Sequence, residues 1–218
     1  MLKIAVITAN IGGFDSQKSF PKQNIECDYF AFTENNLPFP MTSLNPRMKA
    51  KYFKLQAHKL FPDHNAFIWL DSSFQIKSNH FAAYMIEQLN NYGIAVTKHP
   101  ERHCIYQEAA FVDQGLKRGA TYFTNRYLSS KINEEAKRYG VEEYPKNNGL
   151  YACGLFSRRN NPSTNKFFDA WWDRCLQYSV FDQLSFPVLA KKHGISINPL
   201  VFDNYLDNQY YKIVNHSK

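Results

Sequence analysis

Several features that characterise other classes of protein are missing from this 218-residue sequence. No apolar run approaches the roughly 20 residues that a membrane-spanning helix needs. The N-terminal stretch MLKIAVITAN lacks the cleavage pattern of a signal peptide and indicates the start of a strand. The 4 cysteines are widely spaced and include no CxxC pair, which disfavours a zinc site and indicates free thiols in a reducing compartment. These absences predict a cytoplasmic protein.

Acidic residues are also scarce relative to basic ones. The sequence has 19 Asp and Glu against 26 Lys and Arg, which gives a net charge of +7. Such a balance favours anionic partners, among them nucleotides, nucleic acids and the inner face of a membrane. Basic residues are not interleaved with aromatic ones in any single run, so we expect no nucleic-acid partner. Peripheral membrane association through the basic surface stays open.

No repeat, low-complexity linker or break in composition divides the chain, and its 44% hydrophobic and 21% charged residues are typical of a globular protein. We therefore expect one α/β domain over residues 1–218, with a mixed, mostly parallel central sheet flanked by helices. Residues 204–218 are expected to form a mobile tail that becomes ordered when a ligand binds. Short apolar runs that suit buried strands lie at residues 3–9, 28–33, 66–70, 94–97, 150–156 and 195–197.

Helical patterns separate these runs. Asn45 can cap a helix over residues 45–61, with Pro46 in its first turn. Asn161 and Pro162 repeat this arrangement at the start of a second helix. In that helix Phe168, Trp171, Trp172 and Cys175 recur at helical spacing, which favours a buried core face over an aromatic platform for a sugar. Other helices are predicted after a cap at Ser78 or Asn79, from near Ile105, over residues 122–139 ending at Gly140, and over residues 179–193 ending at Gly194.

Polar residues follow several predicted strands. Asp71 ends the apolar run 66–70 and precedes Ser72 and Ser73, while Thr8 and Asn10 lie at the end of the first strand and His99 follows another. Open α/β sheets bind their ligands at the carboxyl ends of strands, so these side chains are candidates for a nucleotide site. The alternative is that Asp71 only forms a turn, since Asp and Ser are common turn residues. The NIGGFD segment after the first strand is not a GxGxxG fingerprint, so a Rossmann dinucleotide site is not indicated.

A basic stripe is predicted on the first helix. Arg47, Lys51, Lys54 and His58 recur at helical spacing and form a stripe without an acidic partner. Such a stripe can be a solvated surface. It can also bind a polyanion, which would relieve the mutual repulsion of its charges.

Four segments together resemble the glycosyltransferase-like domain family of the TOD and MUCI plant proteins and their bacterial relatives. These segments are KAKYFKLQAHKLFP, WLDSSFQI, HPERHCIYQEA and DQLSFPVL, and the resemblance extends from about residue 2 to 200. It implies a GT-A glycosyltransferase fold, a nucleotide-sugar donor and a divalent metal. GT-A enzymes commonly carry Asp-x-Asp where this chain has Asp71 to Ser73, so Ser73 replaces the second carboxylate and puts metal dependence in question.

The resemblance also implies roles for individual residues. Mn²⁺ or Mg²⁺ would bind Asp71, Ser73 and, by analogy with glycogenin-like relatives, His216. Asp182 and Gln183 fall where many GT-A enzymes place a carboxylate or amide beside the reacting sugar. The alternative for Asp182 is structural, because Ser179 and Asp182 have the spacing of a helix N-terminus. Acceptor-side or donor-sugar candidates, which are otherwise ordinary loop residues, are His99, Arg102, His103, Tyr106 and Glu108.

We therefore predict a glycosyltransferase that moves a sugar from a nucleotide-diphosphate sugar to a carbohydrate or other hydroxyl acceptor. Bacterial surface polysaccharide or glycoconjugate synthesis is the setting that the resemblance implies, in the cytoplasm or at the inner face of the membrane. Arg47, Lys51 and Lys54, with Asp71 and the metal, would hold the diphosphate. Two alternatives stay open: a metal-dependent nucleotide phosphoester hydrolase, and a non-catalytic module that binds nucleotides or nucleic acid.

Overall fold

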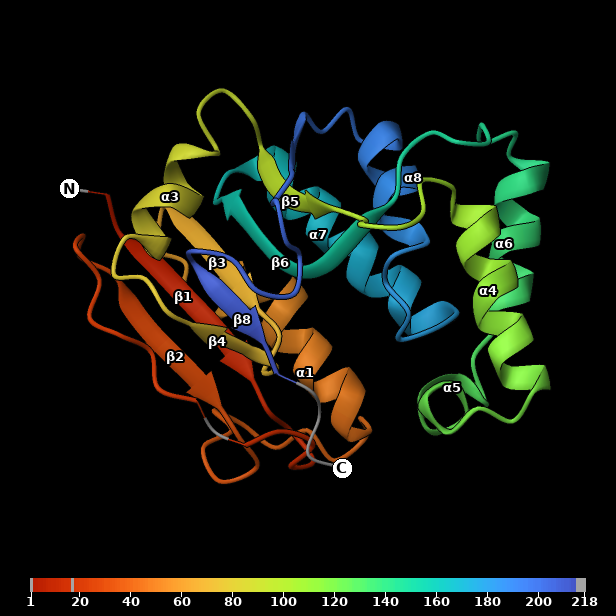
Figure 1. Ribbon diagram of the computed structural model, residues 1–218, viewed down its shortest axis with the longest axis horizontal. Helices are drawn as coiled ribbons and strands as arrows, with labels where there is room; N and C mark the ends of the chain where they lie inside the picture. Colours follow the sequence, from red (N-terminus) through yellow and green to blue (C-terminus); the bar gives the residue numbers. More distant parts are fainter. Residues whose placement is uncertain (1, 17, 215–218) are drawn as a thin grey trace.

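A six-stranded mixed sheet forms the centre of the molecule (Figure 1). The computed structural model describes residues 2–16 and 18–214. Strands β1 (Ile4–Ala9), β2 (Asp28–Phe32), β3 (Ala66–Leu70), β5 (Ile94–Lys98), β6 (Tyr151–Arg159) and β7 (Ile197–Leu200) are arranged in the order β2-β1-β3-β6-β5-β7. Strand β6 pairs antiparallel with both of its neighbours, and the other pairings are parallel. The predicted mixed, mostly parallel sheet is confirmed, and Asp71 lies at the carboxyl end of β3 as expected.

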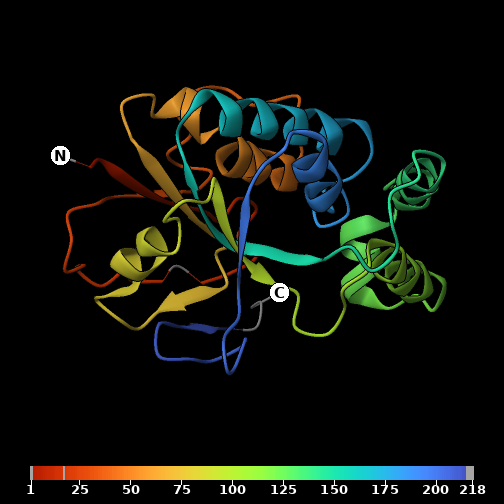
Figure 2. The same ribbon diagram turned by 90° about the horizontal axis from the view of Figure 1, so that it is seen from above.

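Alternating side chains of the central strands divide the core into two layers. Ala5, Ile7 and Trp69 face the layer of α1 (Pro46–Leu55), α7 (Pro162–Gln177) and α8 (Ser185–Lys192). Val6 and Ile68 face the opposite layer, where α3 (Phe81–Glu87) packs. Figure 2 shows the helices α1, α7 and α8 on one face of the sheet and α3 on the other. Because both faces are covered, these strands are apolar throughout rather than alternating with polar residues.

The last strand of the described chain belongs to this second layer. Strand β4 (Phe74–Ile76) follows Asp71 and pairs antiparallel with β8 (Tyr211–Ile213). The Tyr211 side chain is fully buried, and Val214 N donates a hydrogen bond to Ser73 O over 2.9 Å. Up to Val214, the predicted tail is thus paired with the stretch that carries Asp71. His216 lies outside the described residues.

A helical arm stands beside the sheet. It consists of α4 (Ile105–Lys117), α5 (Thr121–Tyr127) and α6 (Ile132–Val141), whose core residues include Ile105, Val112 and Tyr139. The arm packs against Leu184 and Val188 at α8 and is set apart from the two layers in Figures 1 and 2. Within the part of the chain that the structure describes, no helix is both long and apolar enough to cross a bilayer.

Three predicted helices have different bounds in the structure. The helix over residues 45–61 ends at Leu55 and resumes as the short α2 (Ala57–Leu60), because buried Gln56 leaves helical geometry and its amide donates to Phe168 O over 3.4 Å. The helix over residues 122–139 is divided into α5 and α6, since Lys131 N donates to Tyr178 O instead of continuing the helix. Gly140 lies inside α6, so its predicted capping role is wrong.

The third difference is at α8, which begins at Ser185 rather than Ser179. The Ser179 hydroxyl accepts from Phe181 N over 2.8 Å and holds residues 179–184 in a turn. The predicted ending at Gly194 agrees with its φ of 61°, which favours glycine. The Ser78 or Asn79 cap of α3 is also wrong, because His80 occupies the N-cap position. Asn161 caps α7 as predicted, accepting from Thr164 N over 3.0 Å.

Candidate active site

A pocket of about 340 Å³ opens at the carboxyl ends of β1 and β3. Its size is within the usual range for small-molecule sites. Helix α1, the turn before α8, helix α5 of the arm and the segment before β8 complete its lining. Seven of the lining side chains are charged: Arg47, Lys51, Lys54, Arg126, Asp15, Asp71 and Asp182. The pocket is therefore polar at the place where the fold class binds its ligands.

Asp71 is held firmly but remains accessible. Its backbone N–H donates to Gly154 O over 2.8 Å, and its Oδ1 accepts from the Trp69 indole over 2.8 Å. A Cβ atom at Gly154 would lie only 3.1 Å from Asp71 Oδ2, so glycine at this position allows the close approach without a steric conflict. The Asp71 side chain is 47% exposed, and the carboxylate can reach a ligand in the pocket.

Asp182 is buried between two lysines of α1. Its Oδ2 accepts hydrogen bonds from Lys51 Nζ and from Lys54 Nζ, the latter over 2.6 Å. Lys54 Nζ also lies 3.9 Å from Asp71 Oδ1 and is only 2% exposed. Lys54 therefore connects the carboxylate at the end of β3 to the carboxylate before α8.

These contacts fix the charges of the cluster. Burial alone would raise the pKa of Asp182, but Lys51 and Lys54 outweigh it and hold the pKa below its usual value. Burial likewise tends to lower the pKa of Lys54, and Asp182 with Asp71 outweighs it and raises the pKa. The ionised pair is stable near neutral pH, so Asp182 is a poorly basic carboxylate.

Two expectations from the sequence are wrong here. Asp182 does not lie in the first turn of a helix, because α8 begins at Ser185 and the side chain turns toward α1. The basic stripe does have acidic partners, since Lys51 and Lys54 contact Asp182. His58 leaves the stripe altogether: its Nε2 lies 3.3 Å from Asp169 Oδ1, away from the pocket residues.

Most of the other residues predicted for the nucleotide site line the pocket, but Thr8 does not. Arg47, Ser73 and Gln183 line the pocket. Asn10 lines it too, but its amide holds the following turn by donating to Asp15 O over 2.5 Å. Thr8 is not among the lining residues; it is buried in β1, and its hydroxyl has no hydrogen-bond partner among residues 2–16 and 18–214. The prediction that Arg47, Lys51 and Lys54 share a cleft with Asp71 agrees with this geometry.

The acceptor-side candidates form a separate cluster at the base of the arm. The Nδ1 atom of His99 accepts from the backbone N–H groups of Glu101 and Arg102 over 3.2 and 3.0 Å. Burial, and then the charge of Arg102, lower the pKa of His99 to about 4, so its ring is neutral. The Arg102 guanidinium binds the carboxylate of buried Glu108, and Tyr106 donates to Tyr144 O over 2.7 Å. The structure places none of these four in the pocket lining, and His103 is exposed.

Several pocket residues were not identified from the sequence. They include Phe14 and Asp15 after β1, Tyr205 before β8, and Tyr122, Arg126 and Tyr127 on α5. A strand-end position could have indicated Asp15. No local pattern indicates the α5 residues, because they reach the pocket only through the folding of the arm.

The residues of this pocket fit a hard dication poorly. Asp71 has one oxygen engaged by Trp69 and faces the Lys54 ammonium, Asp182 is bound by two lysines, and Asp15 accepts from Ser72 over 2.5 Å. Of the residues that the structure describes, no group of three or more His, Cys, Asp or Glu is suited to hold a metal ion. Magnesium and calcium prefer several oxygen ligands, which the described side chains do not supply together.

The fold and the pocket define a class: an α/β protein with a charged ligand site at the carboxyl edge of a mixed sheet. Within that class, the chain belongs to the family described as TOD1/MUCI70, glycosyltransferase-like domain, whose model matches residues 34–218. The resemblance inferred from the sequence is thereby confirmed, although the matched range begins later and extends to the end.

A curated relative and two solved structures show further similarity. The chain is 22% identical over 171 residues to "Probable hexosyltransferase MUCI70" from Arabidopsis thaliana, which covers 75% of this chain and only 28% of that protein. Mouse xyloside xylosyltransferase 1 in its apo form shares 10% identity with a TM-score of 0.45, covering 91% of this chain and 85% of that chain. A glycosyltransferase involved in glycosylating the major capsid of PBCV-1 shares 11% identity with a TM-score of 0.38, covering 79% and 66%.

Proposed function

We propose that this protein transfers a hexosyl group from a nucleotide-diphosphate sugar to a hydroxyl acceptor. The observation that carries the proposal is the Lys51–Asp182–Lys54 cluster, which opens into the same pocket as Asp71. Family membership and the name of the Arabidopsis relative support a sugar-transfer reaction. Four cationic side chains in the pocket suit a diphosphate, the leaving group of such a reaction.

The roles of the side chains follow from their charges. Lys51 would stabilise the negative charge that grows on the diphosphate as the sugar leaves, because its ammonium lies at the pocket wall. Asp182 is held ionised, so it would stabilise positive charge on the sugar or orient the acceptor rather than remove a proton. Gln183 beside it can hydrogen-bond a sugar hydroxyl.

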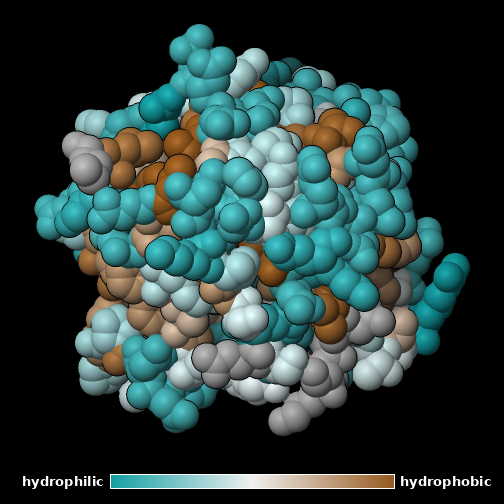
Figure 3. Space-filling view, turned by 60° about the vertical axis from the view of Figure 1, so that its left-hand side comes forward, coloured by the Kyte–Doolittle hydropathy of each residue, from teal (hydrophilic) through white to brown (hydrophobic). Residues whose placement is uncertain are grey.

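The setting of the reaction is part of the same proposal. A cytoplasmic enzyme of bacterial surface polysaccharide or glycoconjugate synthesis, with peripheral contact to the membrane through its basic surface, remains the prediction made from the sequence. The face in Figure 3 is mainly hydrophilic, with scattered hydrophobic patches. A metal at Asp71, Ser73 and His216 also stays a prediction, and no step above depends on it.

A panel of nucleotide sugars tests the proposal. The protein is incubated with UDP-, GDP- and CDP-sugars and simple sugar acceptors, and products are followed by mass spectrometry together with release of the nucleoside diphosphate. We expect one donor to give a glycosylated acceptor, and to stabilise the protein by about 2.7 kcal/mol at 100 times its dissociation constant. Phosphate release without a glycosylated product would support the hydrolase instead, and stabilisation by oligonucleotides alone would support a binding module.

A further inference from the structure

Two guanidinium groups in the pocket have no carboxylate partner among the residues that the structure describes. Arg47 on α1 and Arg126 on α5 both line it, and neither makes an ion pair within residues 2–16 and 18–214. The pocket's lysines are different, because both are bound to Asp182. The two arginines are therefore positive charges in the pocket that no carboxylate of the described residues neutralises.

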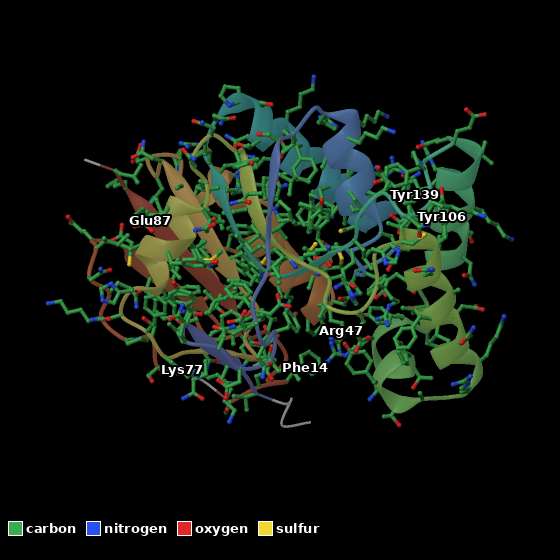
Figure 4. The ribbon with its side chains drawn as sticks, turned by 45° about the horizontal axis from the view of Figure 1, so that its top comes forward. Phe14, Arg47, Lys77, Glu87, Tyr106 and Tyr139 are labelled. Atoms are coloured by element: carbon green, nitrogen blue, oxygen red, sulfur yellow. The ribbon has the colours of Figure 1, made fainter. Side chains whose placement is uncertain are left out.

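Each arginine guanidinium lies over an aromatic ring. The guanidinium of Arg47 lies 4.4 Å from the centre of the Phe14 ring, and that of Arg126 lies 4.1 Å from the centre of the Tyr122 ring. Figure 4 shows Arg47 and Phe14 close together on the side of the molecule toward α5, whereas Tyr106 lies farther along the arm. Stacking holds one face of a guanidinium and leaves its N–H groups free to bind an oxyanion.

The two arginines also disfavour one another in the absence of a ligand. Burial, and then the positive charge of Arg126, lower the pKa of Arg47. Like charges that share a pocket are costly unless an anion lies between them. An anion with two adjacent phosphates can satisfy both guanidinium groups at once, since each pairs with phosphate oxygens in a fork geometry.

We propose that Arg47 and Arg126 form a clamp for the diphosphate of the donor, with one guanidinium carried by α1 and the other by α5 of the helical arm. This inference rests on the proposed function for the identity of the donor. It adds Arg126 and α5 to the site, and makes the position of the arm a condition for tight binding.

Calorimetry with inorganic pyrophosphate in the presence of EDTA tests the clamp directly. The unmodified protein should bind pyrophosphate, and Arg47→Ala and Arg126→Ala should each weaken binding at least tenfold. Arg118→Ala is the matched control, because Arg118 is an exposed arginine of the same arm outside the pocket. Raising the salt concentration should weaken binding to the unmodified protein and to the control.

A thermal-unfolding measurement separates binding from folding. Because the two guanidiniums repel, Arg126→Ala should leave the melting temperature of the ligand-free protein unchanged or raised, while removing the increase that pyrophosphate produces. Nucleoside diphosphates should behave like pyrophosphate and bind more tightly than the monophosphates, which identifies the diphosphate as the recognised group.

Two results would overturn the clamp: no pyrophosphate binding by the unmodified protein, or equal binding by Arg126→Ala. These outcomes are distinct from failure of the proposed function. If the clamp binds pyrophosphate but no nucleotide sugar is consumed, the clamp stands and the transferase does not. If sugar is transferred and Arg126→Ala retains its affinity for pyrophosphate, the transferase stands and the clamp does not.

Discussion

Asp182 combines a buried ion-pair contact with the role in the reaction that we propose for it. It is buried, and its two hydrogen-bonding partners are ammonium groups of one helix. Breaking a buried ion pair by removing one partner costs about 3–5 kcal/mol, because the remaining charge stays buried without compensation. Without the Asp182 carboxylate, the uncompensated charge would be mainly that of Lys54, which is the more deeply buried of the two lysines.

Asp182→Asn should therefore reduce both turnover and stability. We expect kcat to fall by a factor on the order of 100 or more, measured well below the melting temperature of the variant. Lys54→Met is the comparison, because it breaks the same ion pair and leaves the Asp182 carboxylate in place. If the two variants lose activity in proportion to their loss of stability, Asp182 acts only through the fold.

The same pair predicts a pH dependence of unfolding. The folded pKa of Asp182 is below its usual value, so its contribution to stability is present above the unfolded pKa of 3.8 and is lost as the pH falls through the folded pKa. Urea titrations from pH 3 to 6 should show a smaller acid-induced loss for Asp182→Asn than for the unmodified protein. Parallel curves would show that the carboxylate is not held ionised by the lysines.

Lys51 tests the basic helix as a binding surface. Lys51→Ala should weaken binding of the nucleoside diphosphate about tenfold, the cost of one charged contact, with a modest loss of stability because Lys54 still pairs with Asp182. Lys59→Ala is the control, since Lys59 belongs to an exposed pair with Asp169. Unchanged affinity for Lys51→Ala would mean that Lys51 only supports Asp182.

At the scale of elements, the sequence predicted correctly those strands and helix starts that depend on neighbouring residues. The apolar run at residues 66–70 is β3, and the Asn161 cap with Pro162 starts α7, because strand burial and capping depend on adjacent residues. The spacing of Lys51 and Lys54 was likewise visible. Their pairing with Asp182 was not, because Asp182 lies 131 residues after Lys51 and only the fold brings it to α1.

The breaks in helices follow the same logic. Lys131 leaves the helix because its N–H bonds to Tyr178 O at the end of α7, and residues 179–184 stay in a turn partly because Trp171 Nε1 donates to Asp182 O over 3.2 Å. Tertiary hydrogen bonds of this kind override helix propensity, so they could not be predicted from the sequence. Arg126 was not identified from the sequence for the same reason: the position of α5 depends on the tertiary hydrogen bond that ends the helical segment before α6.

The helical arm contains a buried carboxylate, Glu135, which should make the stability of the folded protein depend on pH. Burial raises the pKa of Glu135 from 4.5 to about 7, although Tyr139 donates to it over 2.5 Å. The folded state binds this proton more tightly, so stability is fully present below pH 4.5 and is lost as the pH rises to about 7. The charge of Arg174 lowers the pKa of Glu135 and that of Asp182 raises it, but both effects are smaller than that of burial.

Glu135→Gln should remove this loss while keeping an acceptor for Tyr139. Relative to the unmodified protein, the variant should gain stability at pH 8 by up to roughly 3 kcal/mol, and the gain should vanish near pH 4.5. Denaturant unfolding at several pH values measures it. Glu134→Gln is the matched control, because Glu134 is the exposed neighbour on α6. A gain that does not change with pH would contradict the assignment to Glu135.

At the scale of the whole molecule, the site is assembled from distant parts of the chain. β3 provides Asp71, α1 the lysines and Arg47, the arm Arg126, and the segment before β8 provides Tyr205. Val214 N bonds to Ser73 O, so the described end of the chain is connected to the turn that follows Asp71. Changes in the arm and in the tail should therefore both affect the pocket.

The positive charge that neutralises the diphosphate can come from a metal ion or from side chains of the protein. A metal at Asp71, Ser73 and His216 would make metal and nucleotide binding mutually dependent, each tightening the other by the same factor. The side-chain set around Asp71 instead favours a diphosphate held by Arg47, Arg126 and Lys51. Calorimetry with the nucleoside diphosphate should thus give affinities in Mn²⁺ and in EDTA that agree within about twofold, well under the 1.4 kcal/mol that a tenfold change represents.

A chain ending at Val214 extends the test to the tail. It keeps β8 and the bond to Ser73 but lacks His216, so its affinity in EDTA should equal that of the full chain. Tighter binding in Mn²⁺ by tenfold or more, lost on this truncation, would establish His216 and Asp71 as metal ligands and restore the Asp-x-Asp analogy. Asp71→Asn distinguishes metal-dependent binding from metal-free binding. It should abolish any effect of Mn²⁺ and leave the binding of the diphosphate to the arginines in EDTA intact.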